Sequence, residues 1–179
     1  DDYRVRHAQY RLDPDLQRLH GAVPWVLTWD DHEVENDYAG AQGEYLDPAF
    51  LARRAAAYQA YFEHLPMPPA MPLAGPDARI FTRLDFGDLV RLHILDDRQY
   101  RTPQACPSPA RGGGSTEVVR SQCAELADPG RTLLGAGQER WFTEGVTGSP
   151  ARWNTVVQQT AFVPYGRKHG DDDRVVWTD

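Results

Sequence analysis

Four ionisable residues stand in a row at Asp30, Asp31, His32 and Glu33, directly after Trp29. The apolar run 23–28 before them shows no polar–apolar alternation and lies between structure-breaking residues, which is typical of a buried strand. Ligands of open α/β sheets gather just past the carboxyl ends of strands. Carboxylates and an imidazole packed there need a positive group, and a metal ion is the usual one. The run therefore predicts a metalloenzyme site.

Neighbouring side chains in a turn point in different directions, so these residues cannot all serve one site equally. We expect a carboxylate of Asp30 or Asp31 to bind the metal and His32 to face the substrate. Glu33 and Asn36 would then orient the ligands through hydrogen bonds. The alternative is a solvated acidic loop. The adjacent Trp29 and the apolar run favour the site, because solvated loops seldom place a histidine between carboxylates behind a tryptophan.

Two further polar clusters follow predicted strands. Asp96 and Arg98 come after the apolar run 89–95, and Arg98 offers a planar fork suited to phosphate or carboxylate. The alternative is an aspartate–arginine ion pair that pins the end of a hairpin, and we expect Arg101 at the surface. Gln158 follows the run 153–157. Its amide could bind a hard metal or a phosphate, or it could be an ordinary polar residue at a strand end.

Local signals predict the elements that must position these residues. Asp13 and Pro14 start a short helix that Gly21 ends, and Asp47 and Pro48 start an amphipathic helix that runs to residue 65. Its predicted apolar stripe is Leu51, Ala55, Tyr58, Phe62 and Leu65. We expect a hairpin of strands 79–85 and 89–95, a loop over 102–132, a helix starting at 135 and a strand at 153–157. This mixture indicates an α/β fold.

The composition restricts the partners. A chain of 179 residues with a net charge of −7 suits one domain or a large piece of one, and it lacks the basic surface that nucleic acids or anionic membranes need. No apolar run has the length of a membrane span. The chain opens on Asp1 without an initiator methionine or signal peptide, so we infer a processed or excised segment.

The two cysteines flank a loop rich in proline, glycine and serine. A disulfide between Cys106 and Cys123 is plausible and would favour an exported protein. The alternative is a pair of unpaired loop thiols.

Several ordered motifs resemble one family. The run 28–36, Thr-Trp-Asp-Asp-His-Glu-Val-Glu-Asn, is similar to the hallmark of the alkaline phosphatase D (PhoD-like) metallophosphatases. The segments 10–17, 86–101, 134–141 and 149–159 resemble further signatures of the family in the same order. The departure at Asp97, where the family usually carries a small hydroxyl residue, is minor.

The resemblance implies a calcineurin-like sandwich of two mixed sheets flanked by helices. It also implies an exported alkaline phosphatase or phosphodiesterase that uses calcium and iron. Asp31 matches a metal ligand, His32 a histidine that contacts phosphate, and Gln158 lies near a metal-binding histidine of related enzymes. The substrate would be a small phosphoester or a phosphodiester polymer.

The family's opening and closing metal motifs are not found in residues 1–179. We therefore expect this chain to be the central part of the domain, incomplete at both ends and inactive alone. The alternative is a non-catalytic or scaffold relative that keeps the fold.

Overall fold

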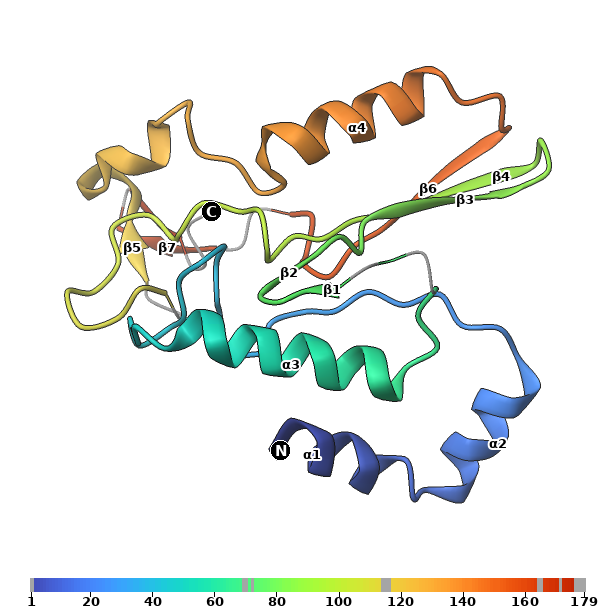
Figure 1. Ribbon diagram of the computed structural model, residues 1–179. Coiled ribbons are helices and arrows are strands. Elements are labelled where there is room, and N and C mark those ends of the chain that lie inside the picture. Colours follow the sequence, from blue (N-terminus) through green and yellow to red (C-terminus); the bar gives the residue numbers. More distant parts are fainter. Residues whose placement is uncertain are drawn as a thin grey trace.

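The computed structural model describes residues 2–68, 71, 73–113, 117–163, 166–170 and 172–175 (Figure 1). The α-helices in this part are α1 (Asp2–Tyr10), α2 (Pro14–Ala22), α3 (Phe50–His64) and α4 (Gly135–Thr147). The strands are β1 (Leu73–Ala74), β2 (Asp77–Ala78), β3 (Thr82–Phe86), β4 (Val90–Ile94), β5 (Val118–Val119), β6 (Trp153–Val157), β7 (Gly166–His169) and β8 (Asp172–Val175). Two short 3₁₀ helices span Arg120–Gln122 and Ala124–Ala127.

The sheet that positions the site has the strand order β3-β4-β6. Strands β3 and β4 form the predicted antiparallel hairpin, and β6 pairs in parallel with β4, with Ile94 opposite Val157. Helix α4 lies along one face of this sheet (Figure 1). Because β4 and β6 run in the same direction, the segments that follow them emerge at one edge. The chain therefore delivers residues 95–98 and 158–160 to the same place.

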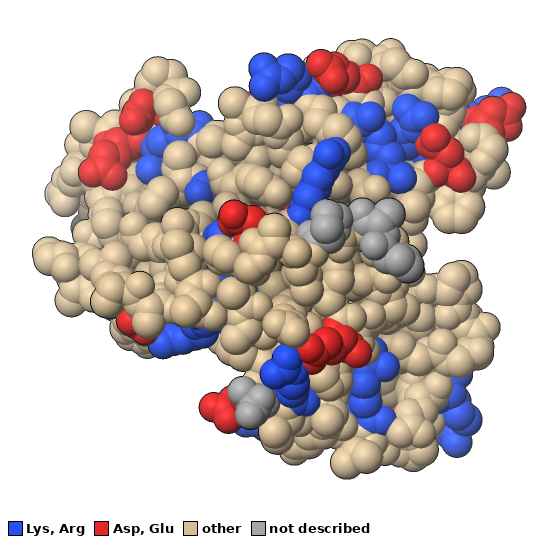
Figure 2. Space-filling view, in the orientation of Figure 1, with Lys and Arg blue, Asp and Glu red and all other residues tan. Residues whose placement is uncertain are grey.

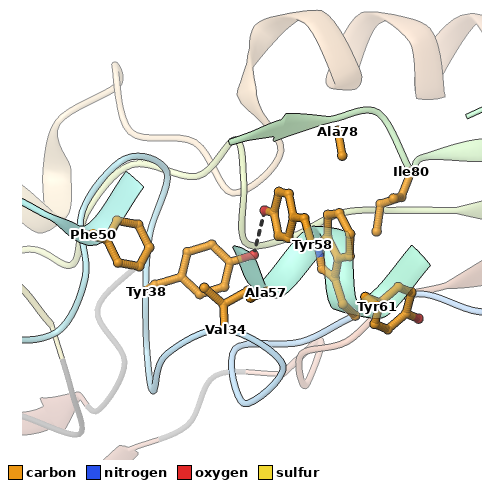
Figure 3. Packing of buried hydrophobic residues seen from close by; sticks show 9 residues of the cluster. Val34, Tyr38, Phe50, Ala57, Tyr58, Tyr61, Ala78 and Ile80 are labelled. Atoms are coloured by element: carbon orange, nitrogen blue, oxygen red, sulfur yellow. Dashed lines mark hydrogen bonds between the residues drawn. The ribbon is translucent and has the colours of Figure 1, made fainter. Parts of the chain in front are cut away.

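Helix α3 carries the main hydrophobic core. Tyr58 stacks on Trp29 with ring centroids 3.9 Å apart, and its hydroxyl hydrogen-bonds that of Tyr38 (Figure 3). The buried face of α3 consists of Phe50, Arg54, Ala57, Tyr58, Ala60 and Tyr61. The helix is where it was expected, but the predicted stripe was wrong in part, because Leu51 is 39% exposed. The face is rotated because the Arg54 guanidinium donates to Pro76 O and pairs with Asp77, which allows a charged residue to turn inward.

The predicted strand at 23–28 is wrong. Residues 24–28 belong to no strand of the described chain, and Val23 and Val26 are 47% and 41% exposed. Pro24 has no N–H to donate to a ladder, and an unbroken apolar run does not by itself fix a pairing partner. Helix α1 and the hairpin of β7 and β8 were not expected. The loop predicted over 102–132 is wrong in part, since it contains β5 and the two 3₁₀ helices.

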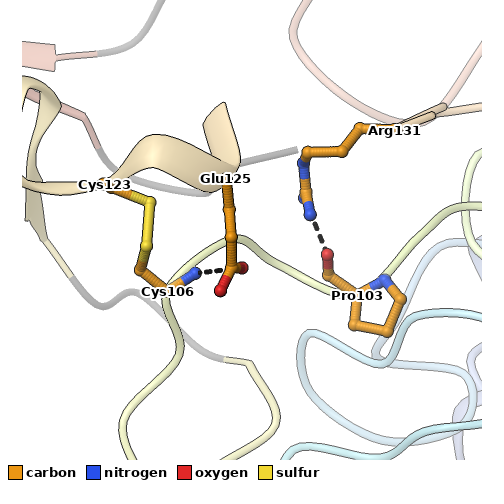
Figure 4. Close-up of a disulfide and its surroundings, with 5 residues drawn as sticks. All are labelled: Pro103, Cys106, Cys123, Glu125 and Arg131. Atoms are coloured by element: carbon orange, nitrogen blue, oxygen red, sulfur yellow. Dashed lines mark hydrogen bonds between the residues drawn. A yellow bond between two sulfur atoms is a disulfide. The ribbon is translucent and has the colours of Figure 1, made fainter. Parts of the chain in front are cut away.

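Cys106 and Cys123 form the expected disulfide, with their Cα atoms 6.0 Å apart (Figure 4). Glu125 accepts a hydrogen bond from the Cys106 N–H, and Arg131 donates to Pro103 O nearby. The bond closes a loop that contains β5, an edge strand of the sheet with strand order β5-β8-β7.

The helices and sheets together confirm the predicted mixed α/β class. None of the helices in the described ranges is long and apolar enough to cross a membrane.

Candidate functional site: a carboxylate cluster around Arg98

Arg98, in the turn after β4, supplies the positive charge that the acidic run needs. The residue is 6% exposed, and its Nε donates to Asp30 Oδ1 at 2.6 Å. The same guanidinium lies 3.5 Å from Asp31 Oδ1 and 3.6 Å from Asp37 Oδ1. The ion pair considered from the sequence is therefore present, although its partners come from the acidic run and not from the hairpin. Asp37 had not been singled out.

The acidic run is folded into a tight turn by its own hydrogen bonds. Asp31 Oδ2 accepts from the Asp37 N–H at 2.7 Å, and Asp31 O accepts from the Val34 N–H at 2.8 Å. Glu33 Oε2 accepts from the Asp30 N–H at 2.9 Å. Asp37 has a φ of +50°, a conformation that aspartate tolerates better than most residues. That tolerance is the sequence signal that could have identified Asp37 as part of the turn.

His32 lies at the surface of this cluster. Its side chain is 80% exposed, its Nε2 is 3.1 Å from Asn36 Oδ1, and it is 4.0 Å from Asp31 Oδ2. The imidazole is therefore held beside buried carboxylates while its ring stays open to an approaching molecule.

Asp96 anchors the turn that carries Arg98. Its Oδ1 accepts from the N–H groups of Arg98 and Gln99, and its Oδ2 accepts from the Gln99 amide. Burial raises the pKa of Asp96, while the hydrogen bonds from Gln99 and Arg98 act in the opposite direction. The Gln138 amide on α4 bonds both the N–H and the C=O of Asp96. The carboxyl group is thus a fixed support inside the protein.

Asp97 and Arg101 extend the ionic cluster inward. Asp97 is fully buried, and its Oδ2 accepts from the Thr160 hydroxyl at 2.8 Å. Burial raises the pKa of Asp97, and the bonds from Thr160 oppose that shift. The expectation of a surface Arg101 is wrong, because the residue is only 4% exposed. Burial, together with nearby Arg98, lowers the pKa of Arg101 to about 10, and Asp37 and Asp97 partly offset this.

The two glutamines after β6 have different surroundings. The Gln158 amide donates to Thr160 O at 2.9 Å, within its own turn. Gln159 instead reaches three other groups: its Oε1 accepts from the Asp97 N–H at 3.2 Å, and its Nε2 donates to Leu95 O and to Thr28 Oγ1. Sequence reasoning selected Gln158, whereas Gln159 is the residue joined to the cluster.

The described residues do not by themselves fit a calcium–iron centre. They contain no group of three histidine, cysteine, aspartate or glutamate side chains arranged to hold a metal ion. Asp30 and Asp31 already face the Arg98 guanidinium, and Gln158 is turned toward Thr160. In this structure the Arg98 guanidinium faces two of the carboxylates that the sequence predicts for the metal.

Comparison with known proteins shows the family of the chain. A model described as "PhoD-like phosphatase" matches residues 1–179. Alkaline phosphatase D of Bacillus subtilis (strain 168) is 43% identical over 167 residues, which are 92% of this chain and 27% of that protein. A solved structure described as "Structure of PhoD" matches with a TM-score of 0.87 and 41% identity, covering 99% of this chain and 33% of that one. The chain therefore belongs to the PhoD-like phosphatase family.

Proposed function

We propose that this chain is the central part of a metal-dependent phosphoester hydrolase of the alkaline phosphatase or phosphodiesterase type. Family membership and 43% identity to an alkaline phosphatase D support a phosphoester hydrolase. The observation that carries the proposal is the placement of His32, an exposed imidazole on the rim of a buried carboxylate–guanidinium cluster. The chain spans 27% of the curated relative, and the activity is proposed for the longer protein of which it would be the central part.

His32 would act directly on the phosphate. An imidazole can hydrogen-bond a phosphoryl oxygen and can pass a proton to the leaving oxygen. With Nε2 held by Asn36, Nδ1 is the nitrogen that would contact the substrate. Asn36 would thus hold the ring with Nδ1 free for the substrate.

Arg98 would make the site acceptable to an anion. The protein carries a net charge of −7, and Asp30 and Asp31 place negative charge at the site itself. The guanidinium offsets these carboxylates, which lowers the repulsion against a phosphate and favours the charge that develops as it reacts.

The use of calcium and iron rests on the family resemblance. Asp30, Asp31 and Gln158 would be the ligands contributed by this chain, with Glu33, Asn36 and Asp96 orienting them. Each proposed ligand has another partner in this structure, and donors in addition to the described residues would be required.

The proposed setting is an exported enzyme with a calcineurin-like sandwich. The Cys106–Cys123 disulfide supports export, because such bonds persist in oxidising compartments. The substrate would be a small phosphoester or a phosphodiester polymer. Figure 2 shows Lys and Arg interspersed with Asp and Glu over the face in view, which offers no continuous basic stripe there for nucleic acid.

The test compares residues 1–179 with the complete enzyme on p-nitrophenyl phosphate and bis(p-nitrophenyl) phosphate, with calcium and iron and then with a chelator. We expect chelator-sensitive turnover in the complete enzyme and little or none in residues 1–179. A complete protein that is folded and loaded with metal, yet turns over neither compound, would instead point to a non-catalytic relative.

A further inference from the structure

Gln159 joins three segments that are distant in the sequence. Its Oε1 accepts from the Asp97 N–H at 3.2 Å, and its Nε2 donates to Leu95 O at 2.9 Å and to Thr28 Oγ1 at 2.5 Å. Thr28 lies 131 residues away along the chain. One amide thus connects the end of β6, the end of β4 and the segment that leads into the acidic run.

These contacts lie next to the residues that form the carboxylate cluster. Thr28 is two residues before Asp30, and Asp97 directly precedes Arg98. Thr28 is held on both sides, since its hydroxyl donates to Leu95 O and its own carbonyl accepts from the Tyr61 hydroxyl. The Gln159 amide is therefore part of the frame that sets Asp30 against the Arg98 guanidinium at 2.6 Å.

A carboxamide is the group that this position requires. It presents an acceptor to the Asp97 N–H and two hydrogens to a carbonyl and a hydroxyl at the same time. An ionised glutamate would keep the acceptor but would place a charge against Leu95 O. Leucine, of similar size, would keep none of the three bonds and would leave the Asp97 N–H without its Gln159 acceptor, while Thr28 Oγ1 and Leu95 O would keep only their bond to each other.

We propose that Gln159 is a positioning residue of the phosphoesterase, which fixes the acidic run relative to the Arg98 turn without touching the substrate. This inference rests on the proposed function. Small displacements of catalytic groups cost rate more than binding, and a misplacement of about 1 Å can lower a rate by about 100-fold. The loss should therefore appear in kcat.

The test uses the complete enzyme and the variants Gln159→Leu, Gln159→Glu and Thr28→Val. We expect Gln159→Leu and Thr28→Val each to lower kcat by about 10- to 100-fold, with KM changed less than about threefold. The double variant should resemble the worse single variant, because both changes break the same link. Thr102→Val is the matched control. It removes a threonine hydroxyl that bonds the backbone N–H and C=O of Thr132 in another loop, and it should leave kcat within about twofold of the wild-type value.

Gln159→Glu distinguishes a positioning role of the side chain from a contribution to overall stability alone. A protonated glutamate offers one O–H and one C=O, in the arrangement of the amide. The kcat of Gln159→Glu relative to wild type should therefore rise as the pH falls through the titration of the new carboxyl group. Any one of three results would overturn the proposal. The first is a ratio of the Gln159→Glu kcat to the wild-type kcat that does not depend on pH. The others are kcat losses that multiply in the Gln159→Leu, Thr28→Val double variant, and a kcat loss in the single variants no larger than that of Thr102→Val.

Hydrogen exchange distinguishes a failure of this inference from a failure of the proposed function. Gln159→Leu should speed exchange of the Asp97 amide hydrogen, which donates to Gln159, whether or not the protein hydrolyses phosphoesters. A wild-type enzyme without turnover would refute the proposed function, and with it any effect of Gln159 on catalysis. Turnover together with unchanged exchange at Asp97 would refute the positioning role alone.

Discussion

Replacing Arg98 with methionine should destabilise the protein strongly. The change keeps most of the side-chain volume but removes the charge that faces Asp30, Asp31 and Asp37. The side chains of Asp31 and Asp37 are 8% and 7% exposed, so water can replace little of the lost interaction there. Asp30 is 41% exposed and contributes less, because solvent screens it.

Removing one partner of a buried ion pair typically costs about 3–5 kcal/mol. The two buried contacts are long, at 3.5 and 3.6 Å, and Arg101 keeps a positive charge near Asp37 and Asp97. We therefore expect a value at the lower end, about 3 kcal/mol, in urea unfolding followed by circular dichroism.

Two comparisons make this prediction specific. Arg18→Met removes an ion pair with Asp15 whose side chains are 77% and 78% exposed, and its effect should be much smaller. Adding Asp31→Asn to Arg98→Met should recover part of the loss, because one uncompensated buried charge disappears. A cost for Arg98→Met no greater than that for Arg18→Met, or strictly additive losses with Asp31→Asn, would refute the role of Arg98 as the neutralising cation.

Two other changes test the surrounding structure. Asp97→Asn should stabilise the protein more at pH 7 than at pH 4. Burial raises the pKa of Asp97 in the folded state. The wild type therefore loses stability as the pH rises from the ordinary carboxyl range through that raised pKa, and the asparagine variant does not. Urea unfolding at both pH values measures this, and a stabilisation that is larger at pH 4 would contradict the sign. Replacing both Cys106 and Cys123 with serine opens a link between residues 17 apart and should cost about 3 kcal/mol in the same assay. An unfolding midpoint equal to that of the oxidised wild type would argue against the disulfide as a stabilising link.

Elements with strong local signals could be predicted from the sequence. The Asp13 cap is observed, with its carboxylate accepting from the N–H groups of Asp15 and Leu16, and strand β6 has its predicted bounds. The error at 23–28 arose because an apolar run does not specify which strand it pairs with. Helix α1 has no buried residue and therefore no apolar stripe to signal it in the sequence, and in the structure it packs beside α3.

The candidate site could be predicted in composition but not in pairing. The acidic run and Arg98 were both identified, yet their contact joins residues 68 apart, which no local pattern encodes. The burial of Arg101 follows from the same long-range charges. Gln159, one position beyond Gln158, is the glutamine bonded to the cluster, because neighbouring residues at a strand end point to opposite faces.

His32 provides the most direct test of the proposed site. In the complete enzyme, His32→Ala removes an exposed side chain, so folding should be retained while kcat on p-nitrophenyl phosphate falls by about 10²- to 10⁴-fold, the usual contribution of a positioned acid or base. A folded His32→Ala enzyme with kcat and KM close to those of the wild type would contradict the account, because the reaction would then occur away from the Arg98 cluster.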